Sequence, residues 1–235
     1  MNPIIQKVRE TISITRLGTT REAAPPVKSA GLWVSAALAG VILGFLAQFL
    51  RQIPGALMVL GASTVPWVMA GFLLAVWSSR GTRTLRQAVL VATGTVAVYL
   101  LLWLVSYHLL FVLREPASLA AGWRQIAPWL IVAVPTSPIL GTIAALSHKR
   151  GLLGDVCLAA PIAWSLTEAF ESLKEGWLVG AAVMTPVAVF TALLIYMVVK
   201  ERRVRPIALL TAVVTLGALG IALFPVFWFL LLGRY

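Results

Sequence analysis

The sequence predicts an all-α integral membrane protein, a polytopic bundle of transmembrane helices with seven spans. Of its 235 residues, 60% are hydrophobic and only 11% are charged, and the mean hydropathy of +0.94 is far above that of a soluble domain. Seven apolar runs reach the roughly 20 residues that a helix needs to cross a bilayer. They cover residues 30–50, 55–78, 85–112, 125–147, 151–173, 177–199 and 206–232. Little chain is left for a soluble domain.

The basic residues sort by side of the membrane. Of the 19 lysines and arginines, fourteen lie in the N-terminal tail and in every second loop, and five lie in the remaining loops and at the C-terminus. The positive-inside rule then predicts a cytoplasmic N-terminus and, with seven spans, an external C-terminus. Topology accounts for most of the net charge of +11, so no nucleic-acid partner is expected. Contact with anionic lipid or with a partner protein is predicted for Arg80, Arg83, Arg86, Arg202, Arg203 and Arg205.

The segment before the first span, residues 1–28, is a basic cytoplasmic tail. Its residues Ile4, Ile5, Val8 and Ile12 fall on one face of a helix among basic residues, which is typical of a short amphipathic helix on the membrane surface. The Ala-Pro-Pro that follows at residues 24–26 is equally compatible with a flexible tail. Both interpretations stay open.

Small residues recur every four positions in the first span, at Ala36, Gly40 and Gly44, and Gln48 continues the series. Small side chains at this spacing let two helix backbones approach closely. The simpler interpretation is packing inside the bundle. The alternative is a face that docks another subunit.

The fourth span contains the stretch IVAVPTSPILGT, residues 131–142, in which Pro135 and Pro138 flank Thr136 and Ser137. Each proline lacks an amide donor and frees a carbonyl one turn earlier, which the bilayer core cannot hydrate. The stretch is therefore either a kinked helix whose free carbonyls are satisfied by neighbours, or a discontinuous helix that lines a polar site, as in many transporters.

Glu168, in the fifth span, is a candidate functional residue that could bind a cation, a substrate amine or a proton. It lies among apolar neighbours, and an ionisable residue inside a span marks a site by default. Trp164 and Trp67 lie deeper than the tryptophans at the span ends, and either shape a pocket or pack in the core. The predicted substrate-binding residues are Pro135, Thr136, Ser137, Pro138, Glu168, Trp164 and Trp67.

No catalytic residue, metal site or cofactor is predicted. His108 and His148 fall near opposite ends of their spans, across a core roughly 30 Å thick, and cannot share a metal ion. The sequence has no phosphate-binding loop, His-Glu-x-x-His motif or nucleophile elbow. The last span also lacks the lysine that a retinal protein needs, and the predicted topology is opposite to that of a G-protein-coupled receptor.

Four segments carry a resemblance: GFLAQFLRQ, GASTVPWVMAGFLLAVWSSRG, PTSPILGTIAAL and APIAWSLTEAF. Together they resemble a family of bacterial multi-pass membrane proteins catalogued only as a domain of unknown function. Ser137 stands where that family's outline has glycine. The resemblance implies a fold and a bacterial plasma-membrane location but no chemistry, and the positions that fit it are Ser63, Trp67, Gly71, Phe72, Pro138, Gly141, Glu168 and Ala169.

Two functions compete on these observations. The first is a transport-type subunit that binds or passes a small molecule while a partner protein supplies energy. The second is a non-catalytic membrane subunit that stabilises or regulates a larger membrane complex through helix packing. An enzyme ranks below both, because no complete pair of nucleophile and base is visible.

Overall fold

The computed structural model describes residues 29–114, 119–174, 176–200 and 202–232, so the predicted tail 1–28 lies outside the described residues. Helices are the only regular elements in these ranges, which confirms the all-α prediction. They are α2 (Ser29–Arg51), α3 (Ala56–Ala62), α4 (Val65–Ser78), α5 (Leu85–Arg114), α6 (Leu119–Ser147), α7 (Leu152–Leu173), α8 (Trp177–Val199) and α9 (Pro206–Leu232).

Six of these helices are each long and apolar enough to cross a membrane. The pair α3 and α4 passes the same test only when taken together, and its two halves are bent by 50° at the break. This pair is either a broken span or a re-entrant loop. By length and composition the chain is a multi-pass membrane protein with six spans, or seven if the pair counts as one span.

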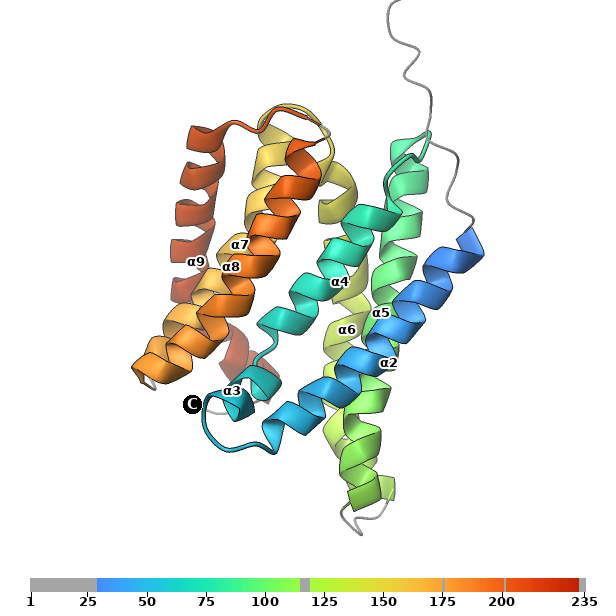
Figure 1. Ribbon diagram of the computed structural model, residues 1–235, viewed down its shortest axis with the longest axis vertical. Coiled ribbons are helices and arrows are strands. Elements are labelled where there is room, and N and C mark those ends of the chain that lie inside the picture. The colour runs from blue at the N-terminus through green and yellow to red at the C-terminus, as the bar shows by residue number, and fades with distance from the viewer. Residues whose placement is uncertain (1–28, 115–118, 175, 201, 233–235) are drawn as a thin grey trace, which may run out of the picture.

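Helix α4 lies at the centre of the bundle (Figure 1), between α2, α5 and α6 on one side and α7, α8 and α9 on the other. Most of its 14 residues are buried, and Met69 and Phe72 are inaccessible. The apolar core continues from α4 onto Tyr99 of α5, Leu158 of α7 and Leu194 of α8. The central position means that a break at the start of α4 faces protein on several sides.

The outward faces of the peripheral helices are apolar. Exposed residues include Leu38 and Ile42 on α2, and Ile207, Leu210 and Val214 on α9. Water would make such faces costly, whereas hydrocarbon does not. These faces indicate contact with the lipid bilayer.

The small-residue face of α2 packs against α5 of the same chain. A Cβ atom at Gly40 would lie 2.6 Å from the carbonyl oxygen of Tyr99, and one at Gly44 would lie 2.5 Å from that of Trp103. Both positions therefore need glycine. Ala36 and Gln48 are buried on the same helix, so this face contacts α5 and is not open to another subunit.

Helix α6 is continuous through its three prolines, Pro128, Pro135 and Pro138. Thr136 and Ser137 each donate a hydroxyl hydrogen bond to the carbonyl four residues earlier, at 2.7 Å and 2.8 Å, while Pro135 and Pro138 are exposed. The structure thus corresponds to an unbroken helix here. The discontinuity lies instead in the second predicted span, between α3 and α4.

Three of the basic loops meet at one end of the bundle, at the top of Figure 1. The Arg80 guanidinium donates to the carbonyl of Met197 at 2.7 Å, and Ser79 Oγ lies 3.1 Å from His148 Nε2. These contacts join the loop after α4 to the C-terminal ends of α8 and α6. These contacts hold the basic segments together at one end of the bundle.

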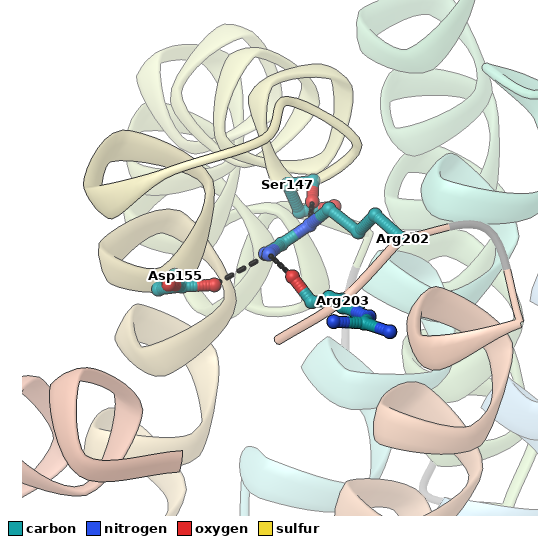
Figure 2. A network of polar contacts seen from close by, with 4 residues as sticks. All are labelled: Ser147, Asp155, Arg202 and Arg203. Carbon is teal, nitrogen blue, oxygen red and sulfur yellow. Dashed lines mark hydrogen bonds and ion pairs between the residues drawn. The ribbon is translucent and has the colours of Figure 1, made fainter. Parts of the chain in front are cut away.

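At the same end, Arg202 forms a buried ion pair with Asp155, shown in Figure 2. Nη1 lies 2.5 Å from Asp155 Oδ1, and Nε donates to the carbonyl of Ser147 at 2.9 Å. Arg202 is 4% exposed, so little of its surface is open to the lipid or partner contact that the sequence predicts. Its guanidinium instead connects the C-terminus of α6 to the first turn of α7, where a carboxylate also suits the helix dipole.

Candidate functional site

The site lies at the break between α3 and α4, and the local sequence explains the break. A helix continuing from α3 would place the ring of Pro66 against the carbonyl of Ala62, four residues earlier, with no amide to bond it. Helix α3 accordingly ends at Ala62, Ser63 is extended, and α4 begins at Val65 with the proline in its first turn. Proline is well tolerated in that first turn because its amide would have no partner there.

The carboxylate of Glu168 fills the gap that this break leaves. Oε1 accepts hydrogen bonds from Ser63 Oγ at 2.7 Å and from the backbone amide of Thr64 at 2.8 Å. Oε2 accepts a short hydrogen bond from Thr64 Oγ1. Thr64 is the N-cap residue of α4 but makes no side-chain cap of its own. Glu168 therefore caps a helix from another span, and its negative charge meets the positive end of the α4 dipole.

Two independent helix lengths place the site at the same depth. The 14 residues of α4 put the break about 21 Å from the basic end of the bundle, at 1.5 Å per residue. Glu168 is sixteen residues beyond Leu152, the first residue of α7, or about 24 Å from that end. Both distances are shorter than the roughly 30 Å thickness of a hydrocarbon core.

The residue before Glu168 on α7, Thr167, faces α9 and sets the rotation of the helix. Thr167 is 1% exposed, and its hydroxyl lies 3.3 Å from the carbonyl of Gly217. A Cβ atom at Gly220 would lie 2.6 Å from the same hydroxyl. Close packing on α9 thus holds α7 with Glu168 directed at the break.

Glu168 has no ion pair among the residues that the structure describes. The nearby basic residue Lys174 pairs with Glu171 instead, at 2.6 Å, near the end of α7. The hydroxyl and amide donors of Ser63 and Thr64 are all neutral. The site therefore holds a partly buried carboxylate without a basic counterion.

The other predicted site residues lie apart from these contacts. The hydroxyls of Thr136 and Ser137 bond only within α6, although α6 and α7 do pack together. Trp164 is 39% exposed and lies one turn before Glu168 on α7. No hydrogen bond among the described residues joins the Pro135 to Pro138 stretch to the carboxylate.

Trp67 belongs to a row of aromatic rings between α4 and α5. Its ring stacks on Trp103 with centroids 6.3 Å apart, and Trp103 stacks on Tyr107 at 5.3 Å. Its carbonyl accepts a hydrogen bond from Tyr99 Oη at 2.8 Å, and Trp67 is 4% exposed. These contacts correspond to core packing, three residues beyond the N-cap of α4.

Sequence reasoning missed Thr64 and gave Ser63 no role in the site. A signal was present, because Ser-Thr followed by Val-Pro inside an apolar run is typical of a helix N-terminus. That pattern marks a helix start where the apolar run alone predicts a continuous span.

Within the described residues, no three His, Cys, Asp or Glu side chains gather closely enough to hold a metal ion. Chemically, the site offers a carboxylate that can bind a cation, an amine or a proton. Comparisons of the chain with protein-family models, with curated proteins and with solved structures give no significant match.

Proposed function

We propose that the protein is a transport-type membrane subunit that binds or passes a small cationic molecule at Glu168, with a partner protein supplying the energy. The proposal includes seven spans, α3 with α4 being one broken span, in a bacterial plasma membrane. It also includes a cytoplasmic N-terminus and an external C-terminus. The gathering of three basic loops at one end of the bundle supports this orientation.

The observation that carries the proposal is the carboxylate at the break. A charge within the hydrocarbon region is costly, and such residues mark substrate, ion or proton pathways. The α4 dipole and three neutral donors compensate the charge of Glu168 in part. A bound cation, protonated amine or proton would complete the compensation, and broken helices at depth in the membrane are the recurring setting of transporter sites.

The energy source is assigned to a partner because the sequence carries no phosphate-binding loop. Substrate-binding membrane subunits that borrow an external ATPase are the analogy. The exposed arginines Arg83, in the loop after α4, and Arg86, in the first turn of α5, are suited to docking such a partner at the basic end.

A second candidate is a non-catalytic subunit of a larger membrane complex. The observation that favours it is the exposure of α9. Only 6% of its segment Pro206–Leu223 is buried inside the chain. The main contact of α9 within the chain is with α7. On this alternative, Glu168 has only the structural role of capping α4.

Purification in mild detergent, followed by mass spectrometry of the bound small molecules, distinguishes the two. We expect a small cationic molecule to copurify with the wild type and to be lost from Glu168→Gln, because glutamine keeps the shape but removes the charge. The matched control is Glu171→Gln on the same helix, which should retain the molecule.

A stoichiometric membrane protein partner, with no small molecule that depends on Glu168, would contradict the transport proposal and favour the second candidate. Equal loss from Glu168→Gln and Glu171→Gln would also contradict it, because the effect would then come from the charge of the helix end.

A further inference from the structure

A hollow of about 670 Å³ opens at the basic end of the bundle, between the start of α7 and the start of α9. Its walls carry three arginines, Arg150, Arg203 and Arg205, and its floor reaches the apolar side chain of Ile207. The arginines come from two different loops, 55 residues of chain apart at the extremes. The fold, and not one basic run of sequence, brings them together.

The three guanidinium groups in the hollow belong to exposed arginines. Among the described residues none of them has a hydrogen-bond or ion-pair partner, whereas Arg202 beside them is buried against Asp155. Like charges so close repel one another and attract an anion. Arginine is the side chain best matched to phosphate, because its planar donors bind two oxygens at once.

An apolar groove of about 370 Å³ continues from the hollow along α7 and α9. Apart from Thr211 and Thr215, every residue that lines it is apolar, from Leu152 on α7 to Leu216 on α9. The α9 wall runs from Ala208 to Leu216, about 12 Å at 1.5 Å per residue.

The hollow and the groove adjoin at consecutive residues on both walls. On α7, Gly151 lines the hollow and Leu152 lines the groove; on α9, Ile207 lines the hollow and Ala208 lines the groove. A phosphate alone would fill only the hollow, and an apolar helix would fill only the groove. The occupant that matches both is amphipathic and anionic.

We propose that the hollow and groove together bind one anionic glycerophospholipid, with its phosphate at Arg150, Arg203 and Arg205 and an acyl chain between α7 and α9. This site lies at the opposite end of α7 from Glu168. The lipid site is separate from the site proposed for the transported molecule. A lipid bound there contacts both α7 and the exposed helix α9, and so adds to their direct packing.

The test is a lipid titration of the full chain, purified in a neutral detergent and followed by native mass spectrometry. The probes are dioleoyl phosphatidylglycerol, dioleoyl phosphatidylcholine and glycerol phosphate. We expect one saturable phosphatidylglycerol site, and binding at least tenfold weaker for phosphatidylcholine and for glycerol phosphate. Equal binding of phosphatidylcholine would overturn the anionic headgroup, and equal binding of glycerol phosphate would overturn the lipid.

Two pairs of variants locate the site. Arg203→Gln with Arg205→Gln should weaken phosphatidylglycerol binding about 25-fold, at about a factor of five per arginine near an anionic headgroup. Arg83→Gln with Arg86→Gln removes the same charge between α4 and the first turn of α5, outside the hollow, and should change binding less than twofold. Equal losses in the two double variants would show a net-charge effect and overturn the site.

The groove is tested by filling it. Ala212→Phe places a ring between α7 and α9 and should weaken phosphatidylglycerol binding at least fivefold, whereas Val214→Phe, on an exposed face of α9 outside the groove, should leave it unchanged. Unchanged binding in Ala212→Phe would overturn the placement of the acyl chain. All these positions are partly or fully exposed, so the thermal stability of each variant serves as the folding control.

Discussion

Helix α7 carries three carboxylates, and two of them, Asp155 and Glu168, lie in opposite electrostatic settings. Asp155, in the first turn, is inaccessible and lies 2.5 Å from the guanidinium of Arg202. Glu168, near the other end, is partly exposed, and within the part of the chain that the structure describes its carboxylate accepts hydrogen bonds only from the neutral donors of Ser63 and Thr64. Among the described residues, a basic partner neutralises the charge of Asp155 and none neutralises that of Glu168.

The difference separates a structural charge from a candidate functional one. A buried ion pair holds its elements in place and leaves no charge for a ligand. A carboxylate that is held in place but lacks a counterion keeps its charge available. We therefore expect Asp155 to control stability and Glu168 to control binding.

The largest expected effect is on stability, at the buried pair. Asp155→Leu leaves the guanidinium of Arg202 buried without its partner, so the free energy of unfolding should fall by about 3–5 kcal/mol. Denaturant titration in micelles measures this change. The double variant Asp155→Leu with Arg202→Met replaces both charges by apolar groups and should recover most of the loss; failure to recover would mean that the pair acts through more than its charges.

The next effect comes from close packing beside the same pair. Gly154→Ala would place a methyl group against the carbonyl oxygen of Lys149 and should cost about 2–3 kcal/mol. The control is Gly217→Ala in α9, where no atom lies within 4 Å of the added Cβ and the better helix propensity should be neutral or favourable. Equal melting temperatures for the two variants would contradict the close contact at Gly154.

At Glu168, two substitutions distinguish the loss of the hydrogen-bond acceptor from the loss of the negative charge. Glu168→Leu leaves the hydroxyls of Ser63 and Thr64 and an amide without an acceptor, so a loss of about 2–3 kcal/mol is expected. Glu168→Gln keeps an acceptor oxygen and should cost less than about 1 kcal/mol. If Glu168→Gln destabilised the protein as much as Asp155→Leu does, the division between the two carboxylates would fail.

The smallest effect is expected at the end of α7. Glu171 and Lys174 form an ion pair in which the lysine is 60% exposed, and such pairs contribute less than about 0.5 kcal/mol. Glu171→Gln should leave the melting temperature unchanged within error. A clear loss of stability would show that this end of the helix is more tightly packed than its exposure indicates.

Most of the helices could be predicted from the sequence, because apolar runs of membrane-spanning length are a local signal. The position of the break could not. Pro135 and Pro138 stay within a helix because their rings are exposed and nearby hydroxyls bond the helix backbone. Pro66 begins a new helix, and the acceptor that stabilises this start is Glu168, more than a hundred residues later.

The roles of the charged residues were also beyond local patterns. Counting basic residues per loop distinguishes the two ends of the bundle, but it does not distinguish Arg202 from its neighbours Arg203 and Arg205. The buried partner of Arg202 is Asp155, 47 residues earlier. Glu168 was identified correctly as an ionisable residue inside a helix, whereas its contacts with Ser63 and Thr64 depend on the packing of separate spans.

The central claim, an available negative charge at the break, can be measured without knowing the ligand. Cys157 is the only cysteine and is buried, so Thr64→Cys in a Cys157→Ala background carries one thiol, beside Glu168. A small cationic thiol reagent should modify this thiol about tenfold faster than an anionic reagent of similar size, after correction for their reactivity with a free thiol. Adding Glu168→Gln should bring the ratio close to one, and a ratio that is already near one with Glu168 present would contradict the account.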